Sequence, residues 1–327
     1  MDTLSQVLTA IRLTGAVFLE MTLRERWSYL TAPARAIADV LMPDADHVIP
    51  YHLLTAGACY ARLMSGKPVA LQAGDVILFP SGDRHVLAAA TPAALSLPPV
   101  EITGNSLHEL LTRGEVEPLK AGARGSATRI VCGFLACDAQ LAAPIISSLP
   151  RMLRVRLKGS GNASWVMNSI QFSVAESAAR RPGSAMVLAR LSEVLFAEAL
   201  RQHMDDQPTQ RTGWLGALKD RFVGKALAHM HEQPAADWTV EELARCVGLS
   251  RSALGERFVR LVGMPPMQYL LRWRISLAAA QLRQSDASVR KVAADAGYES
   301  EAAFIRVFKK EFGAPPSAWR RQTGSRA

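Results

Sequence analysis

The residues of this chain with the greatest potential for chemistry are two histidines and two cysteines, namely His52, His85, Cys132 and Cys137. Imidazole nitrogens and thiolates are the ligands that tetrahedral zinc prefers. Two cysteines separated by four residues could instead form a disulfide and respond to oxidation. A third interpretation is that both cysteines are ordinary buried side chains. The sequence leaves these three interpretations open.

The composition is that of an ordinary globular protein. A chain of 327 residues is long enough for about two domains. Its four cysteines are too few and too scattered for a disulfide framework. Residues 1–20 lack the basic start of a signal peptide, and no run of about 18 apolar residues predicts a membrane span. We therefore expect a cytoplasmic protein without a membrane partner.

Positive charge is concentrated in the C-terminal third. The net charge is +9, and residues 218–327 hold 18 Lys and Arg against 11 Asp and Glu, a net +7. The first 217 residues hold the other 20 and 18, a net +2. This distribution favours an anionic partner for the C-terminal third, and the DNA backbone is the expected one. A basic surface that only maintains solubility is the alternative.

The N-terminal half is predicted to form β-structure. Short apolar runs between residues 51 and 79 are separated by turn signals such as Gly57 and Gly74. This spacing indicates an antiparallel sandwich or barrel. A further strand is expected at 128–135, and the proline-containing stretch 90–125 is expected to be a long loop.

A helical hairpin is predicted after the β-structure. Its second helix has Leu188, Leu191, Leu195 and Ala199 on one face, and a proline-glycine turn precedes it. The hairpin could pack against the sheets or form a subunit interface, and both interpretations remain open. The polar stretch 205–213 is expected to link the domains.

An internal repeat in the C-terminal third recurs at an offset of 49 to 50 residues. Each copy has a short helix with an apolar i, i+3, i+4, i+7 face, a glycine turn at Gly248 or Gly297, and a second helix that begins at Ser250 or Ser300. This is the pattern of a helix-turn-helix, present twice. The chain is therefore predicted to bind DNA.

A long helix is predicted between the two copies. Residues 267–284 carry apolar residues on two sides, so the helix should pack against something on each side. Eighteen residues at about 1.5 Å each span about 27 Å. Such a spacer suits two helices placed in successive major grooves, about 34 Å apart.

This arrangement resembles the AraC/XylS family of bacterial transcription regulators over about a hundred residues. The resemblance implies sequence-specific binding of double-stranded DNA, contact with RNA polymerase if the protein is an activator, and no bound cofactor. The residues that carry it are Ala244, Gly248, Leu249, Ser250, Leu254, Arg257, Phe258, Gly263, Pro266, Arg274, Ala278, Val292, Ala293, Gly297, Tyr298, Phe304, Arg306, Phe308, Lys309, Gly313, Pro316 and Trp319.

By position, the resemblance implies that outward residues of both second helices touch bases. Arg306 is the best single candidate, because a guanidinium matches the two acceptors of guanine. Glu256 departs from the family pattern, in which many members carry arginine, and a carboxylate can only accept hydrogen bonds. The expected base contacts are Ser252, Gly255, Glu256, Glu301, Ala302 and Arg306, and the expected phosphate contacts are Ser250, Arg251, Ser300, Lys309 and Lys310.

The segment from Gly74 to His85 resembles the second motif of the cupin superfamily, a small β-barrel. Metal-dependent cupins need a His-x-His and a carboxylate upstream, whereas here His47 stands alone with Asp44 and Asp46 nearby. We therefore expect no catalytic metal and no enzymatic activity. Such barrels in AraC-type regulators usually bind a small effector, for which His52, Arg62 and His85 are the candidate lining residues.

The expected fold is α+β and multidomain. An N-terminal cupin-like barrel that binds the effector should occupy 1–150, and the helical hairpin, which could form a homodimer, 151–204. A linker at 205–213 should precede an all-α domain at 214–327, in which a long helix joins two helix-turn-helix lobes.

The predicted function is a transcription regulator that senses a small effector of unknown identity. One alternative is a redox- or metal-responsive regulator that uses Cys132 and Cys137 with His52 and His85. Two others are a metal-dependent cupin enzyme fused to a DNA-binding module and an architectural DNA binder without a ligand.

Overall fold

The computed structural model describes residues 2–11, 13–41, 45–102, 117–121, 125–157, 161–178, 181–207 and 212–324. Asp44 and part of the expected linker, 208–211, lie outside the described residues. The chain forms two compact units. The barrel unit comprises Leu13–Cys137 and Leu149–Asp206, and the helical unit comprises Met1–Arg12, Asp138–Ser148 and Gln207–Ala327.

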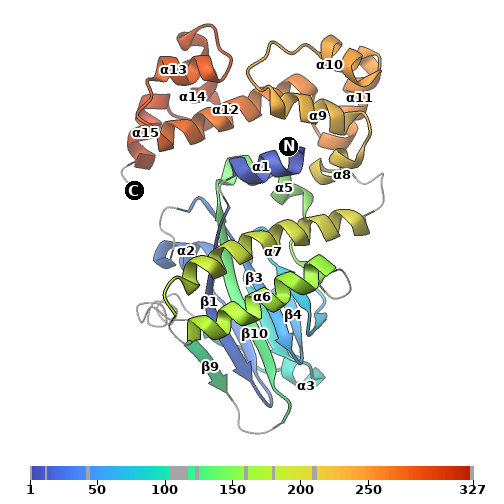
Figure 1. Ribbon diagram of the computed structural model, residues 1–327, viewed down its shortest axis with the longest axis vertical. Helices are drawn as coiled ribbons and strands as arrows, with labels where there is room; N and C mark the ends of the chain where they lie inside the picture. The colour runs from blue at the N-terminus through green and yellow to red at the C-terminus, as the bar shows by residue number, and fades with distance from the viewer. Residues whose placement is uncertain are drawn as a thin grey trace. The chain divides into compact units, whose positions relative to one another are not determined.

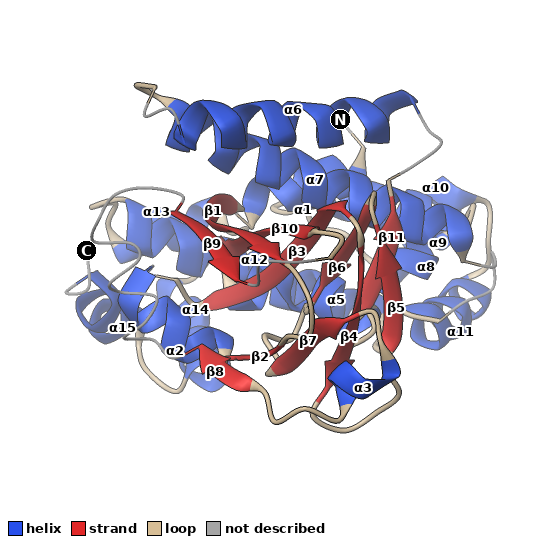
Figure 2. Ribbon diagram, turned by 90° about the horizontal axis from the view of Figure 1, so that it is seen from below, coloured by secondary structure: helices blue, strands red, loops and turns tan. Residues whose placement is uncertain are grey.

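Two sheets form the barrel unit, which confirms the expected cupin-like β-structure (Figure 2). Most strand pairs are antiparallel, and β1–β9 and β2–β8 are parallel. The first sheet has the order β11 (Leu153–Arg156), β6 (Asp75–Leu78), β3 (His47–Ala56), β10 (Thr128–Cys137), β1 (Thr14–Leu23) and β9 (Glu117–Ala121). The second has the order β5 (Val69–Gln72), β4 (Ala58–Leu63), β7 (His85–Ala89), β2 (Ser28–Thr31) and β8 (Val100–Ile102).

Several elements of the barrel unit differ from the sequence-based expectation. The stretch 90–125 is not a plain loop, because it contains the short helix α3 (Pro92–Leu95) and strands β8 and β9; 103–116 lies outside the described residues. Strands β1 and β2 and helix α2 (Ala34–Leu41) were not expected. Parallel pairing joins strands distant in sequence, so a local pattern does not reveal it.

The predicted helical hairpin consists of α6 (Gly161–Ala178) and α7 (Ser184–Asp206) (Figure 1). Helix α7 lies against the first sheet: the Tyr51 and Ser192 hydroxyl oxygens are 2.6 Å apart, and a Cβ at Gly15 would lie 2.3 Å from the carbonyl oxygen of Ala189. In α6, Trp165 and Phe172 are 59% and 65% exposed. Packing on the sheet thus accounts for α7 but leaves two aromatic side chains of α6 in solvent.

The helical unit begins with helices from the N-terminal half of the chain, so the predicted boundary at residue 150 does not coincide with the compact units. The Ser148 hydroxyl in α5 accepts a hydrogen bond from the Trp214 backbone N–H at 2.7 Å, and Asp138 pairs with Arg283. The helices are α1 (Thr3–Ala10), α5 (Ala139–Ser148), α8 (Trp214–Lys219), α9 (Val223–Glu232), α10 (Val240–Val247), α11 (Arg251–Val262), α12 (Pro266–Gln284), α13 (Val289–Asp295), α14 (Glu301–Phe312) and α15 (Pro316–Gly324).

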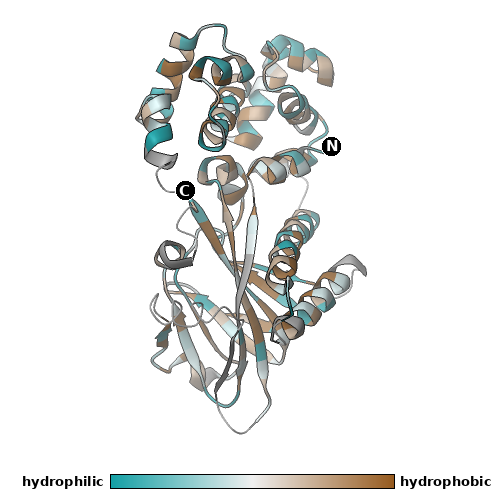
Figure 3. Cartoon of the chain, turned by 60° about the vertical axis from the view of Figure 1, so that its left-hand side comes forward, coloured by the Kyte–Doolittle hydropathy of each residue, from teal (hydrophilic) through white to brown (hydrophobic). Residues whose placement is uncertain are grey.

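The internal repeat forms two helix-turn-helix lobes, as predicted. The first lobe contains α10 and α11, and the second contains α13 and α14. Thr239 and Glu242 form a capping box at the start of α10, and Gly248 and Gly297 have φ of +77° and +78° at the turns. Hydrophilic and hydrophobic segments alternate along these helices, as amphipathic helices require (Figure 3).

Helix α12 is buried on two sides, which confirms the prediction of a spacer between the lobes. Tyr269 packs on Phe258 of α11 with ring centroids 5.8 Å apart, whereas Ile275 and Ala278 belong to the core of the second lobe. Leu271, an apolar residue within the predicted helix 267–284, is 37% exposed.

The two turn glycines should respond differently to substitution. A left-handed φ costs about 1 kcal/mol for alanine, and a Cβ at Gly248 would meet no atom within 4 Å. A Cβ at Gly297 would lie 2.7 Å from the carbonyl oxygen of Ala235, so the backbone must also shift. We expect Gly297→Ala to lower the free energy of unfolding clearly more than Gly248→Ala in chemical denaturation. Equal losses would show that the contact with Ala235 does not constrain the turn.

Candidate DNA interface and barrel interior

The two candidate reader helices, α11 and α14, begin at capped serines. The Ser250 hydroxyl oxygen accepts from the Ala253 N–H at 3.2 Å, and that of Ser300 accepts from the Ala303 N–H at 3.4 Å. Capping satisfies backbone donors that the first helical turn otherwise leaves unpaired. Both serines are exposed, so they lie at helix ends that can approach a phosphate.

The exposed side of α14 carries unpaired positive charge. Ala302, Arg306 and Lys309 lie at i, i+4 and i+7, share one face and are exposed, as are Glu301 and Lys310. The opposite side buries Phe304 and Phe308 in the lobe core. Within the described part of the chain, no ion pair engages Arg306, Lys309 or Lys310. Their cationic groups are therefore free to meet an anion.

The exposed side of α11 is less positive. Arg251 forms an ion pair with Glu241 of α10, with Nη1 2.7 Å from Oε1. Ser252 and Glu256 are exposed, and a Cβ at Gly255 would meet nothing within 4 Å. The predicted contacts of this helix thus lie on an open surface, but the guanidinium of Arg251 already has a carboxylate partner.

Two of the arginines that carry the family resemblance connect separate segments of the helical unit through hydrogen bonds. Arg257 binds Asp220 through Nε at 3.0 Å and Nη2 at 2.5 Å. Burial opposes ionisation of Asp220, but hydrogen bonds from Arg257 and two backbone N–H groups outweigh it and lower its pKa. Arg274 donates to the carbonyl oxygens of Pro234 and Ala236. The motif spacing did not reveal these roles, because Asp220, Pro234 and Ala236 all lie outside the motif.

A buried polar cluster occupies the barrel interior. His52 Nδ1 lies 3.0 Å from Cys132 Sγ, and His52 Nε2 lies 2.7 Å from His85 Nε2. His85 Nδ1 lies 2.9 Å from the carbonyl oxygen of Asp83, and the Phe79 ring stacks on the His85 ring with centroids 3.4 Å apart. The structure thus brings His52, His85 and Cys132 together.

The partners of the two rings fix the direction of each hydrogen bond. The Asp83 carbonyl can only accept, so His85 Nδ1 carries a proton and, in the neutral ring, Nε2 accepts. His52 Nε2 then donates to His85, and His52 Nδ1 accepts from the Cys132 thiol. The cluster is a chain of three neutral donors, in which every ring nitrogen has a partner.

Burial keeps the three groups of this hydrogen-bond chain uncharged. Desolvation lowers the pKa of His85 to about 4, and desolvation with the neighbouring His85 lowers the pKa of His52 well below its usual value. Desolvation also raises the pKa of the Cys132 thiol. At neutral pH the interior therefore holds two uncharged imidazoles and a thiol, which suit a neutral polar ligand better than an anion.

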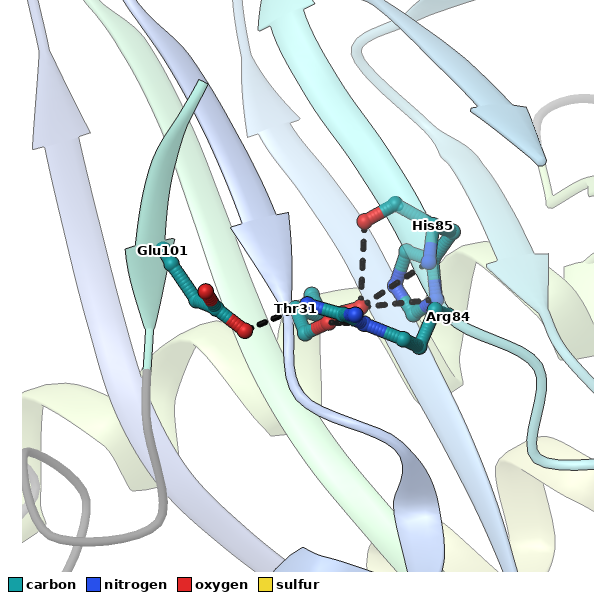
Figure 4. Close-up of polar contacts among 4 residues, drawn as sticks. All are labelled: Thr31, Arg84, His85 and Glu101. Atoms are coloured by element: carbon teal, nitrogen blue, oxygen red, sulfur yellow. Dashed lines mark hydrogen bonds and ion pairs between the residues drawn. The ribbon is translucent and has the colours of Figure 1, made fainter. Parts of the chain in front are cut away.

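The neighbourhood of His85 continues toward solvent through Thr31 and Arg84 (Figure 4). The Thr31 hydroxyl oxygen accepts from the His85 backbone N–H and lies 3.1 Å from His85 Nδ1. Arg84 donates to the Thr31 carbonyl oxygen and pairs with Glu101. These contacts connect the start of β7 to β2 and β8.

Arg62 does not lie beside His52 and His85, and the prediction that it lines the barrel interior is wrong. Adjacent residues of a strand face opposite sides of the sheet. Cys59 and Ala61 of β4 belong to the core between the sheets, so Arg62 points to the other face. His47 lies apart as well, because its Nε2 donates to the Pro80 carbonyl oxygen at 2.6 Å.

The structure separates Cys132 from Cys137, which contradicts the interpretation of these two as a disulfide pair. Both lie on β10, five positions apart, so they face opposite sides of the strand at a separation of roughly 16 Å. A disulfide needs Cα atoms within about 7 Å. All four cysteines are free, and Cys246 alone among them is exposed.

Among the described residues, no group of three or more His, Cys, Asp or Glu side chains is arranged to hold a metal ion. None of their helices combines the length and apolar character that a membrane span requires.

Comparison with known proteins decides the family. A family profile described as "Cupin" matches residues 2–205, and one described as "Helix-turn-helix domain" matches residues 243–322. A putative AraC-like transcription regulator from Streptomyces antibioticus is 29% identical over 98% of this chain and 99% of its own. The chain belongs to the AraC family of transcription regulators, with an N-terminal cupin domain.

Other AraC-type proteins match as well. The transcriptional regulator AlkR from Acinetobacter baylyi is 26% identical over 99% of this chain and 100% of its own. The crystal structure of the DNA-binding domain of AdpA with a target DNA is 32% identical over 33% of this chain and 96% of its own, with a TM-score of 0.32.

The environments of the four thiols predict their reactivity in this AraC-type regulator. Thiolate is the reactive form, and burial raises the pKa of Cys59 and Cys137 to about 12 and also raises that of Cys132. We expect one thiol per native chain to react quickly with a disulfide reagent such as DTNB, and Cys246→Ser to abolish that phase. A fast phase that survives in Cys246→Ser would support the redox-responsive alternative.

Proposed function

We propose that this AraC-type regulator binds double-stranded DNA through the exposed faces of α11 and α14. The observation that carries the proposal is the row of unpaired cations on α14, formed by Arg306, Lys309 and Lys310 and backed by a buried aromatic core. Helix α12 supports each lobe on one of its sides, so the two reader helices are held on one rigid spacer.

Arg306 is the proposed base contact of the second lobe. Its guanidinium is exposed and lies one turn along the face from Ala302, away from the N-cap Ser300. Lys309 and Lys310 follow at the end of the helix, where a phosphate is the more accessible partner. In the first lobe we propose Ser252, Gly255 and Glu256 for the bases and Ser250 and Arg251 for the phosphates.

The barrel interior is the proposed effector site. A polar uncharged ligand could enter the chain of hydrogen bonds between Cys132, His52 and His85 by replacing one of its links, because each ring offers one donor and one acceptor. A change there reaches β7 and, through Thr31, strand β2. We propose no catalytic role for these residues, since their nitrogens are already paired and no metal-binding group accompanies them among the described residues.

The exposed aromatic residues of α6 support a proposed homodimer. Trp165 and Phe172 lie at i and i+7 on one face, while Val166, Ile170 and Val174 are buried on the other. Exposed apolar groups of this size mark contact surfaces. Contact with RNA polymerase and a cytoplasmic location are further proposals, which rest on the family alone.

Arg306 and Lys309 provide a matched pair of variants. On an operator selected from random DNA, Arg306→Ala should cost about 1–3 kcal/mol of binding free energy and flatten the preference at one base pair. Lys309→Ala should weaken binding to all sequences similarly and reduce the slope of log K against log salt by about 1. Fluorescence anisotropy at several salt concentrations measures both. Equal weakening on all sequences by Arg306→Ala would make Arg306 a phosphate contact.

Metal content tests the proposed effector site against its metal-dependent alternative. We expect purified protein to hold less than one iron, manganese or zinc per chain, and dialysis against EDTA to leave operator affinity unchanged within two-fold. His85→Ala should alter the response to an effector in a reporter assay but not operator affinity without effector. One tightly bound metal per chain, lost in His85→Ala or Cys132→Ser, would contradict this proposal.

A further inference from the structure

Helix α5 is the segment in which the chain enters the helical unit from the barrel unit and leaves it again. Strand β10 ends at Cys137 and α5 begins at Ala139, so Asp138 alone separates them. After Ser148, the last residue of α5, the chain returns to the barrel unit at Leu149. One residue has only two soft backbone dihedrals, so a shift of the end of β10 also shifts the start of α5.

Asp138 binds the start of α5 to other parts of the helical unit. Its Oδ1 caps the helix by accepting from the Gln140 and Leu141 N–H groups at 3.0 and 2.9 Å. Its backbone N–H donates to the carbonyl oxygen of Ile11, after α1, at 3.1 Å. Its Oδ2 pairs with Arg283 near the end of α12, and the two side chains are only 9% and 22% exposed. Solvent ions therefore screen this ion pair little.

Arg283 extends this contact into the second lobe. Its guanidinium carbon lies 5.3 Å from the ring centroid of Trp319 in α15. The Trp319 ring packs on Phe308, with centroids 5.7 Å apart, and Phe308 is buried on the inner side of the reader helix α14. The start of α5 is thus connected to the core that supports the second reader helix.

The other end of α5, beside α8, is bound to the first lobe (Figure 1). The Ser148 hydroxyl donates to the Pro144 carbonyl oxygen at 2.8 Å and accepts from the Trp214 backbone N–H at 2.7 Å. Gly213, which precedes Trp214, donates its N–H at 2.8 Å to the carbonyl oxygen of Leu261 in the last turn of α11. Helix α5 therefore contacts the second lobe at its start and the first lobe at its end.

The hydrogen-bond chain of the barrel interior reaches both segments that flank α5. At one end of this chain, Cys132 lies on β10, five residues before Cys137. At the other end, the Asp83 carbonyl accepts from His85. The Asp83 carboxylate in turn binds Arg151, three residues after α5, through Nε at 3.1 Å and Nη2 at 2.5 Å. A ligand that replaces a link of this chain would thus act on both flanking segments.

We propose that α5 transmits the state of the barrel interior to the DNA-binding lobes, and that Asp138 and Arg283 are the positioning residues for this coupling. The proposal rests on the proposed effector site and DNA interface and adds the route between them. A ligand that holds the end of β10 in place would also hold Asp138. The lobes bound to α5 would then lose less conformational freedom when they bind DNA, so the two ligands would favour each other.

The reciprocal effect can be measured without an effector. By linkage, operator DNA selected from random sequence should restrain the end of β10 in the full chain. Pulse alkylation with N-ethylmaleimide, followed by mass spectrometry of peptides, measures the reaction rate of each thiol. Cys137 is buried and reacts when local opening exposes it, so we expect operator DNA to slow its alkylation at least 3-fold. Cys59, on β4 of the other sheet, should change less than 1.5-fold.

Substitutions separate the ion pair from the helix cap. Asp138→Asn keeps a capping side chain but loses the charge, and Arg283→Gln removes the charge of the partner. In both variants the effect of DNA on Cys137 should fall below 1.5-fold, whereas Arg283→Lys should retain at least 2-fold. Asp295→Asn makes the same charge change within the exposed ion pair with Lys291 on α13 and should behave as wild type. Thermal unfolding checks that each variant is folded.

The outcomes are distinguishable. Wild type that binds operator DNA without a change at Cys137 would overturn the proposed coupling. A DNA effect that persists in both Asp138→Asn and Arg283→Gln would overturn it as well. Equal slowing at Cys59 would do the same, because it would show that DNA stabilises the barrel unit as a whole. Wild type that binds no operator DNA would instead refute the proposed DNA interface, and this proposal with it.

Discussion

The helical unit depends on one constraint, that α12 must be apolar on two sides. Each helix-turn-helix lobe has too few residues to bury a core by itself. On one side of α12, Tyr269 supplies a ring to the first lobe, and on the other Ile275, Ala278 and Leu282 complete the core of the second. The spacer is therefore part of both cores. It cannot bend or slide without opening one of them, so the separation of the two lobes follows from core packing.

The barrel unit is subject to a different constraint: the polar groups that it buries must be uncharged and hydrogen-bonded. Each link of the chain from Cys132 through His52 and His85 to the Asp83 carbonyl pairs one donor with one acceptor. A buried group without a partner would cost about 1–3 kcal/mol, and an ionised one far more. The neutral chain thus stabilises a single arrangement of the interior. A ligand that enters it must restore each hydrogen bond that it breaks.

Local signals in the sequence predicted the features that depend on neighbouring residues. The capping serines, the glycine turns at Gly248 and Gly297 and the period of α7 each depend on residues within a few positions, so they were predicted correctly. Arg62 was misplaced because its face depends on the phase of β4 against a distant strand. Likewise α5 joins the helical unit through Asp138 and Ser148, and no local pattern encodes that contact.

The two reader helices have the same backbone arrangement, but their exposed faces differ in charge. This asymmetry constrains how the proposed interface can work. On α11, Glu241 neutralises Arg251 and Glu256 adds a negative charge. On α14, Arg306 and Lys309 meet no carboxylate among the described residues. In the proposed interface, attraction to phosphate therefore comes mainly from the second lobe. Because α12 joins the two lobes, a second lobe bound through its cations would also place α11 against the DNA. The first lobe then needs only to discriminate between bases, and a carboxylate that accepts from cytosine can do so without adding to non-specific affinity.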